Sequence, residues 1–331
     1  MRLINLRRIS NLLKRVTCRQ AKAYNKRKAI LFFFLTSSIA IPAHSAQALL
    51  KITEYIYIIR GDGYEITRDN LGRIANIGVI VQGEEALVVN TGVSYKHGAS
   101  IIETIEKGLK KKIIGAIVLE PSGEYVFGAS AFRDAGIPVA SHPEGVNLIS
   151  TRCNKCLLNL EETLGKEMMS TKLVIPSSSK DVNFKKLIDK FKIKIVDTDS
   201  SAYPGAILLY ANESQVLFSG SIVMTDVVPD IKLANTKAWT NLLKNIPSDP
   251  LLKIIPNLGK IGDGTTVFST IDYLTRLESV TETLFEDNVG LIRGSHQSSL
   301  PDFEHYHLYD KRHFNNFMYR YLALENVELA N

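Results

Sequence analysis

Short apolar runs separated by polar turns dominate the chain from residue 50 onward. Residues 76–81 and 85–92 predict two strands joined by the turn 82–84, and residues 113–119 predict a short buried strand. Between them, residues 97–110 place apolar side chains at helical spacing, namely Ile101, Ile102, Ile105 and Leu109. The first half of the chain therefore predicts strands that alternate with helices.

The buried strand at 113–119 is followed by a polar loop that opens a helix. Before helical character resumes at Gly128, the loop presents Glu120, Ser122, Glu124 and Tyr125. Because α/β proteins place their chemistry where strands end in loops, this loop is the first candidate region for a functional site.

The second half of the chain again combines strands with helices. Strands are predicted at residues 52–59, 139–141, 172–175, 193–196, 206–210 and 215–218, the last two forming a hairpin. Helices are predicted at 156–164, where Gly165 stops the helix, and at 237–245, 267–285 and 312–324. The last of these helices carries an apolar stripe made of Phe314, Phe317, Met318, Tyr321 and Leu322. Two β-rich halves covered by helices predict an α/β (α+β) fold, a four-layer αβ/βα sandwich.

The first 48 residues differ in composition from the rest. Residues 1–28 carry ten Lys and Arg and no acid, residues 29–41 are apolar, and Ala46-Gln47-Ala48 is a small-residue cleavage pattern. We therefore expect a signal peptide with a long basic leader at 1–48, one domain at 49–331, and a periplasmic or secreted protein. An uncleaved amphipathic anchor or a transit peptide is the alternative. The apolar run is shorter than the roughly 20 residues that span a bilayer, so the mature form is not expected to be membrane-spanning.

Removing this leader reverses the charge of the protein. The whole chain carries +6 and residues 1–28 carry +10, which leaves −4 for the mature part. The basic pI therefore belongs to the leader, and no nucleic-acid partner is expected.

Cys153 and Cys156 form the only C-x-x-C pair of the sequence. In an exported protein they predict a structural disulfide or two inert thiols. A redox pair is the alternative, since the two cysteines lie near a predicted helix start, where a thiol pKa is lowered. A structural zinc is not expected, because no second metal-binding pair is present.

The order of elements resembles the metallo-β-lactamase superfamily, whose corresponding strands lead to a His-x-His-x-Asp-His loop that holds two zinc ions. The resemblance covers residues 50–325. Two stretches are similar to one branch, the exported zinc metallohydrolases of quinoprotein relay systems and their relatives in sulfur-oxidation operons. They are Arg152-Cys153-Asn154-Lys155-Cys156-Leu157 with the residues up to 171, and Leu300-Pro301-Asp302-Phe303 with Tyr309, Asp310, His313, Asn316 and residues 319–325.

The resemblance also implies where the zinc ligands of the family would lie, and these positions carry other residues. The four ligand positions of the loop fall on Glu120, Ser122, Glu124 and Tyr125, and no histidine occurs among them. The remaining positions fall on Ala202, before Tyr203-Pro204-Gly205, on Ser221 in Ser219-Gly220-Ser221, and on Leu258 in Pro256-Asn257-Leu258-Gly259. Asn90 replaces the Asp of an Asp-Thr-Gly turn. Two zinc ions need imidazole and carboxylate ligands at about 2.0–2.2 Å, and Ala and Leu offer no donor atom.

These substitutions predict a fold that has lost its dizinc site, with no cofactor bound and no metal-activated water. Our first hypothesis is therefore a non-catalytic binding or accessory protein, with a periplasmic quinoprotein or cytochrome as the partner that the resemblance implies. The alternatives are an ester or thioester hydrolase that uses Glu120 and Glu124, and a redox module that uses Cys153 and Cys156.

Other candidate groups are weaker. Glu120 and Glu124 form an acid/base pair only if burial separates their pKa values; otherwise they are solvated loop carboxylates. His305, His307 and His313 have metal-binding chemistry but lie on the C-terminal motif, and His142 is expected to be structural. The sequence contains neither a phosphate-binding loop nor a dinucleotide fingerprint.

Overall fold

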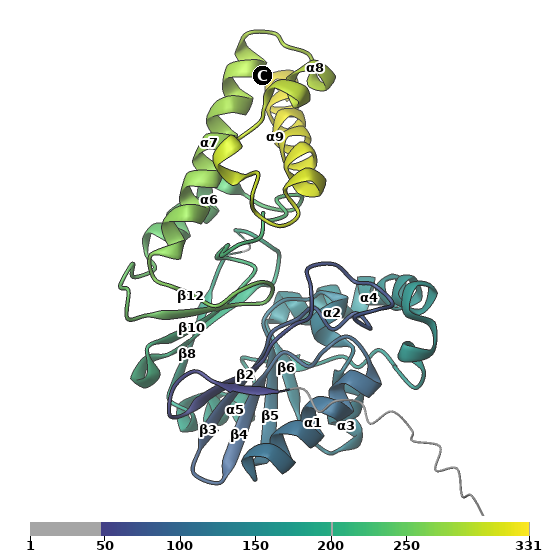
Figure 1. The fold of residues 1–331 in the computed structure, drawn as a ribbon. Coiled ribbons are helices and arrows are strands. Elements are labelled where there is room, and N and C mark those ends of the chain that lie inside the picture. The colour runs from purple at the N-terminus through teal and green to yellow at the C-terminus, as the bar shows by residue number, and fades with distance from the viewer. Residues whose placement is uncertain (1–47, 200, 331) are drawn as a thin grey trace, which may run out of the picture. The chain divides into compact units, whose positions relative to one another are not determined.

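Two β-sheets form the centre of the structure, a computed structural model that describes residues 48–199 and 201–330 (Figure 1). The first sheet has seven strands in chain order: β1 (Leu49–Lys51), β2 (Ile56–Ile59), β3 (Ile77–Gln82), β4 (Glu85–Val89), β5 (Lys112–Val118), β6 (Val139–Ser141) and β7 (Ser177–Ser178). The second has the order β12 (Gly262–Asp263), β11 (Lys253–Pro256), β10 (Val216–Gly220), β9 (Ile207–Ala211) and β8 (Ile193–Asp197). The predicted signal peptide lies, except for residue 48, outside the described residues.

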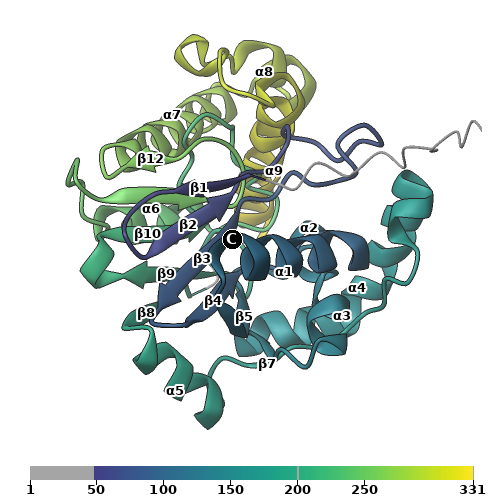
Figure 2. The ribbon, with the colours of Figure 1, turned by 60° about the horizontal axis from the view of Figure 1, so that its bottom comes forward.

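Helices lie on the outer faces of both sheets (Figures 1 and 2). Those of the first half are α1 (Tyr95–Leu109), α2 (Gly123–Val126), α3 (Ala129–Asp134), α4 (Pro143–Leu164) and α5 (Val182–Lys190). Those of the second half are α6 (Thr236–Lys244), α7 (Thr266–Glu286), α8 (Leu291–Gln297) and α9 (Tyr309–Ala330). In the part of the chain that the structure describes, no helix is both long and apolar enough to cross a bilayer.

The alternation of side chains along the strands creates the four layers. In β4, Leu87 and Val89 point into a core shared with the second sheet, whereas Val88 packs against helices on the other face. In β10, Phe218 faces the first sheet and Leu217 faces α6, α7 and α9. Because both faces of each sheet are buried, the strands read as continuous apolar runs in the sequence. The predicted four-layer αβ/βα architecture is confirmed.

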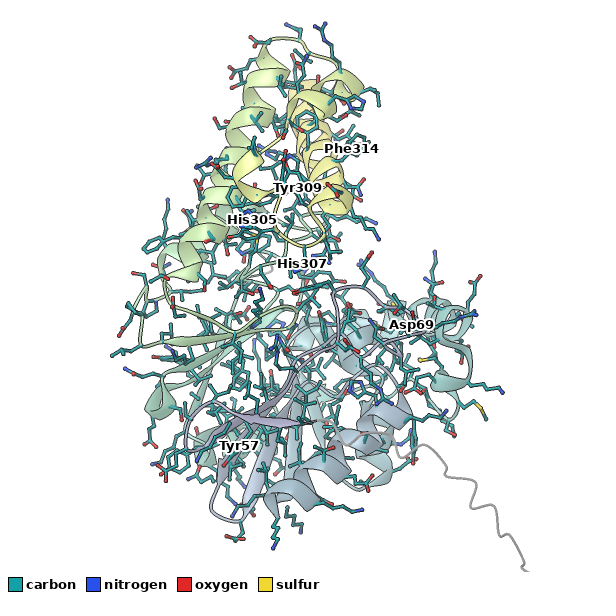
Figure 3. All side chains as sticks on the ribbon, viewed as in Figure 1. Tyr57, Asp69, His305, His307, Tyr309 and Phe314 are labelled. Atoms are coloured by element: carbon teal, nitrogen blue, oxygen red, sulfur yellow. The ribbon has the colours of Figure 1, made fainter. Side chains whose placement is uncertain are left out.

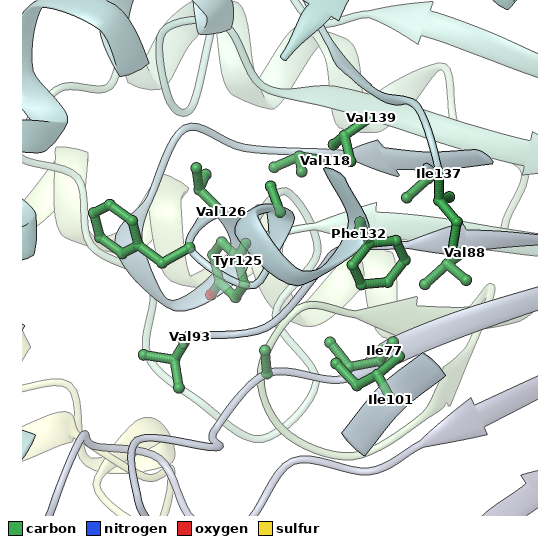
Figure 4. Close-up of a cluster of buried hydrophobic side chains, with 14 of the residues drawn as sticks. Ile77, Val88, Val93, Ile101, Val118, Tyr125, Val126, Phe132, Ile137 and Val139 are labelled. Carbon is green, nitrogen blue, oxygen red and sulfur yellow. The ribbon is translucent and has the colours of Figure 1, made fainter. Parts of the chain in front are cut away.

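Helices α1 and α3 cover the outer face of the first sheet. Ile101 of α1 and Phe132 of α3 are buried with the β-strand side chains Val88 and Val118 (Figure 4). Ile105 of α1 belongs to the same cluster. Tyr125 of α2 lies in the same cluster, so the segment after β5 is anchored in the core. Burial of this apolar surface fixes the backbone that follows the strand.

The two sheets are also joined by backbone hydrogen bonds near the ends of their parallel strands. The Ile207 amide, at the start of β9, donates to the Leu119 carbonyl just after β5 at 2.9 Å. The Asn76 amide, just before β3, donates to the Asn257 carbonyl just after β11 at 2.8 Å. The loops that follow β5, β10 and β11 are therefore held close to one another.

Four local predictions are wrong in informative ways. Residues 52–59 are not one strand, because the Ile52 amide bonds to the Ile56 carbonyl and turns the chain between β1 and β2. Residues 172–175 form no strand; Leu173 and Val174 pack on the helical core, and pairing begins at Ser177. Part of the loop after residue 119 is the short helix α2.

The fourth wrong prediction is the apolar stripe of the last helix. Phe314 and Leu322 are 38% and 40% exposed, while the polar residues His313 and Asn316 are buried beside Phe317. Buried hydrogen bonds explain why polar side chains of this helix face the core. Asn316 donates to the Tyr273 hydroxyl and the Pro229 carbonyl, each at 2.8 Å.

Gly128 provides a test of the close packing behind the site. A Cβ atom there would lie 1.8 Å from the Thr91 carbonyl oxygen, which belongs to rigid backbone. We expect Gly128→Ala to lower the free energy of unfolding by about 2 kcal/mol or more, because overpacking of a tight core is costly. Urea unfolding monitored by circular dichroism measures the effect.

The matched control is Gly290→Ala, where no atom lies within 4 Å of the added Cβ. This variant should be nearly as stable as the wild type. Equal stability of the two variants would contradict the close approach of Gly128 to the Thr91 carbonyl.

Candidate functional site

A cavity of about 160 Å³ lies where the loops after the parallel strands meet. All seven positions that the sequence singled out line it: Glu120, Ser122, Glu124, Tyr125, Ala202, Ser221 and Leu258. They come from the end of β5, from α2, from the loop before β9, and from the segments after β10 and β11. Side chains far apart in the sequence are therefore brought together by the two sheets.

Glu120 is a buried carboxyl group in this wall, only 5% exposed. Its Oε2 accepts a hydrogen bond from Asn257 Nδ2 at 3.3 Å. Burial raises the pKa of Glu120 to about 7; Ser221 and Asn257 oppose this by hydrogen bonding, and the Glu124 charge reinforces it. The interpretation of Glu120 as a solvated loop carboxylate is therefore wrong.

Neutral carboxamides surround this carboxyl group. Asn257 Oδ1 accepts a hydrogen bond from Asn90 Nδ2 at 2.8 Å, and Asn90 Oδ1 accepts one from the Leu119 amide at 3.2 Å. Asn76 Nδ2 donates to the carbonyls of Pro256 and Gly259, each at 2.9 Å. Asn90 was a candidate from the sequence, whereas Asn76 and Asn257 were not. The contacts of these two residues span more than 130 residues of sequence, so no local pattern indicates them.

Glu124 differs from Glu120 because it is partly exposed and lies on α2. Its Oε2 accepts a hydrogen bond from Ser122 Oγ at 2.6 Å. Helix α2 thus places a second carboxyl group in the lining of the cavity.

Tyrosines supply neutral hydroxyl groups to the same wall. Burial raises the pKa of Tyr125 well above its ordinary value, with smaller contributions from the charges of Glu124 and Glu120. Burial likewise raises the pKa of Tyr203 to about 12, and both glutamates reinforce it. Both phenols therefore stay protonated near neutral pH and can donate hydrogen bonds.

Arg312 of α9 contributes a positive charge that the sequence analysis missed. It lines the cavity, and its Nη1 donates to the Val228 carbonyl at 2.6 Å. Within residues 48–199 and 201–330 it has no carboxylate partner within 4.0 Å. Its place within the C-terminal motif, between Asp310 and His313, was the available signal. The cavity thus combines carboxyl groups with one guanidinium.

The residues present do not fit two zinc ions. Ala202 and Leu258 have no donor atom, and hydroxyl groups stand at Ser122 and Ser221. Nowhere in the described chain do three or more His, Cys, Asp or Glu side chains converge as a metal would require.

The structure does not bring the C-terminal histidines together as a site. His307 stacks on Tyr64 with ring centroids 3.7 Å apart, and His305 packs against Tyr306. Figure 3 shows the positions of His305 and His307. His313 is buried, with its Nε2 2.8 Å from the Ser298 carbonyl. His305 and His307 thus contribute to packing on the segment that leads into α9, and His313 contributes a buried hydrogen bond within α9.

His142 has a structural position, as expected. It caps α4, and its Nε2 lies 2.9 Å from Asp197 Oδ2.

Cys153 and Cys156 are free thiols on α4. The expectation that they lie near a helix start is wrong, because α4 begins at Pro143, nearly three turns earlier. The helix N-terminus therefore contributes nothing to the acidity of these thiols.

No protein-family model and no curated protein matches this sequence. Solved structures do match its shape. A metallo-β-lactamase from Erythrobacter litoralis, with β-mercaptoethanol in its active site, has a TM-score of 0.54 at 14% identity over 70% of this chain and 97% of that chain. The DIM-1 metallo-β-lactamase has a TM-score of 0.53 at 17% identity over 69% and 96%. The FIM-1 enzyme from Pseudomonas aeruginosa, in its mono-zinc form, has a TM-score of 0.51 at 16% identity over 69% and 95%.

These comparisons establish the fold alone, since every identity is low. The chain has the metallo-β-lactamase fold that the resemblance implied. The narrower similarity to the quinoprotein relay branch stays a prediction.

The buried carboxyl group generates a test of the electrostatics of the cavity. The folded-state pKa of Glu120, about 7, exceeds its ordinary value of 4.5. Its contribution to stability is therefore fully present below about pH 4.5 and is lost as the pH rises through 7. Glu120→Gln cannot ionise, so its stability relative to the wild type should rise by about 3 kcal/mol across this range. Urea unfolding at a series of pH values measures the difference.

Glu161→Gln is the matched control, because Glu161 is exposed on α4. Its stability relative to the wild type should not change with pH. A difference for Glu120→Gln that stays flat from acid to neutral pH would show that this carboxyl group is not desolvated.

Proposed function

We propose that this chain is an exported protein that uses the metallo-β-lactamase fold to bind a small polar molecule without cleaving it. The observation that carries the proposal is the composition of the cavity. At the positions where the fold family holds metal, it presents a buried carboxyl group and two side chains without donor atoms. Such a wall can form hydrogen bonds and ion pairs with a ligand but cannot activate water through zinc.

The lining also indicates the kind of ligand. Glu124 and Arg312 carry opposite charges, while Tyr125, Tyr203 and Trp239 give aromatic surface. A molecule with both hydrogen-bond donors and acceptors and a small apolar part fits this combination.

Export and partner are also part of the proposal. The basic leader, the apolar run and the cleavage pattern of residues 1–48 support a periplasmic or secreted location. The similarity of residues 152–171 and 300–325 to the quinoprotein relay branch supports a periplasmic quinoprotein or cytochrome as the partner.

A hydrolase is the second candidate, favoured by one observation. The pKa of Glu120 is raised by burial to about 7, the range in which a carboxyl group serves as a general acid or base. Glu124 lines the same cavity and could hold the attacking water or the substrate.

We expect the purified chain to retain far less than one zinc ion per molecule in the cavity after zinc loading and dialysis. Elemental analysis by mass spectrometry measures this, in a Cys153→Ser, Cys156→Ser background that removes thiol ligands. The physical reason is the missing donor set.

The positive control restores the donors of the family on the same backbone. It carries Glu120→His, Ser122→His, Glu124→Asp, Tyr125→His, Ala202→His, Ser221→Asp and Leu258→His. This variant should gain tightly bound zinc if it folds, which circular dichroism checks. Two zinc ions retained by the unrestored protein would contradict the proposal.

A thermal-shift screen of small charged, zwitterionic and neutral molecules tests binding. A ligand of the cavity should raise the melting temperature of the wild type, and Arg312→Ala or Glu124→Gln should weaken its binding about tenfold or more. Lys311→Ala is the control, because this neighbour of Arg312 pairs with Glu65 outside the cavity.

Two outcomes of the screen would decide against binding alone. Equal affinity of all three variants would exclude the cavity as the site. Ester or thioester turnover that persists with a chelator and disappears in Glu120→Gln would establish the hydrolase instead.

A further inference from the structure

Cys153 and Cys156 form a thiol pair with unequal exposure. They are three residues apart on α4, so their side chains are neighbours on one face of the helix. Cys153 is only 1% exposed and belongs to the apolar core with Ile149 and Leu160, whereas Cys156 is partly exposed at its edge. An outside reagent can therefore reach one sulfur and not the other.

The closeness of the two thiols on one helix face favours negative charge on the exposed one. A hydrogen bond from Cys153 stabilises the Cys156 thiolate and lowers the pKa of Cys156 to about 7. The same hydrogen bond, together with burial, raises the pKa of Cys153. In its neutral form the Cys156 thiol points to the Arg152 carbonyl, with Sγ 3.8 Å from the oxygen.

The groups that face this pair from other elements belong to the cavity wall. Glu124 of α2 opposes ionisation of both thiols, and the thiols in turn raise the pKa of Tyr203. Helix α2, which carries Glu124 of the cavity wall, contacts α4, which carries the thiol pair.

We propose that Cys153 and Cys156 are a redox-active dithiol that exchanges with disulfides of low-molecular-weight thiols, with Cys156 attacking and Cys153 resolving. This activity does not depend on the ligand of the cavity.

The exchange takes place in two steps. The Cys156 thiolate attacks one sulfur of a disulfide R–S–S–R, the S–S bond breaks, and the leaving thiolate takes a proton from solvent. Cys153 then loses its proton to solvent and attacks Cys156 Sγ, which releases the second R–S⁻ to be protonated. The dithiol is oxidised by two electrons to a Cys153–Cys156 disulfide, and the substrate is reduced to two thiols. Excess thiol drives the reverse reaction.

Helical geometry explains why this disulfide should remain easy to reduce. Residues three apart on a helix have Cβ atoms about 5–6 Å apart, whereas a disulfide needs about 3.5–4.5 Å. Oxidation must therefore deform α4 around residues 153–156. Strain of this kind makes a disulfide more readily reduced than an unstrained structural one.

The first experiment measures which thiol reacts. The full chain with Cys18→Ser is reduced and treated with iodoacetamide across a pH series, and each cysteine is followed by peptide mass spectrometry. We expect Cys156 to be alkylated at least tenfold faster than Cys153 at neutral pH, and the Cys153→Ser variant to need a higher pH for the same rate. Equal rates for the two thiols, or faster labelling of Cys153, would overturn the assignment.

The second experiment measures cycling in glutathione buffers. The wild-type pair should convert reversibly between dithiol and disulfide as the buffer changes, with faster amide exchange in α4 in the oxidised form. Cys153→Ser should accumulate a mixed disulfide with glutathione on Cys156, and Cys156→Ser should accumulate far less on Cys153. A wild-type pair that stays reduced in oxidised glutathione, or that cannot be reduced again by reduced glutathione, would refute the proposal.

Discussion

The site depends on the way Asn257 joins the two sheets beneath the cavity. Its amide donates to the Gly220 carbonyl and its carbonyl accepts from the Asn76 amide, each at 2.8 Å. Its side chain bonds to Asn90 at 2.8 Å and to Glu120 at 3.3 Å. One residue after β11 thus contacts segments next to β3, β4, β5 and β10. Since an unpaired buried polar group is costly, these bonds must form together, and they fix the walls of the cavity.

The hydrogen bonds around Asn257 also determine the chemical character of the cavity. The groups beneath Glu120 are neutral carboxamides, which accept and donate hydrogen bonds without bringing a compensating positive charge. Glu120 is therefore desolvated without a cationic partner, and its pKa rises to about 7. A metal ion would have the opposite effect and hold nearby carboxylates in their charged form. The cavity wall thus contains a desolvated carboxyl group that changes its charge near neutral pH.

The C-terminal part of the chain, although distant in sequence from the other lining residues, contributes Arg312 to the site. The His307 amide donates to the Asp226 carbonyl, and the His307 carbonyl accepts from the Val228 amide, so the segment before α9 is held on the segment after β10. This places Arg312 at the cavity, where it bonds to the Val228 carbonyl. The motif residues Tyr309, His313 and Asn316 maintain this arrangement through buried hydrogen bonds. None of these three residues lines the cavity, so they stabilise the segment that carries Arg312 and do not contact a ligand there.

Apolar runs such as residues 113–119 and turn residues around Gly128 are local signals, and they predicted the layered α/β architecture. The seven cavity positions were predicted through the resemblance of the sequence to the metallo-β-lactamase superfamily. Residues 172–175 and the stripe around Phe314 were predicted wrongly, because apolar spacing does not reveal which side chains find partners in the core. The burial of Glu120, the place of Arg312 at the cavity, and the burial of Cys153 beside a partly exposed Cys156 follow from the folded structure. Burial and long-range hydrogen bonds depend on segments distant in sequence, and no local pattern carries that information.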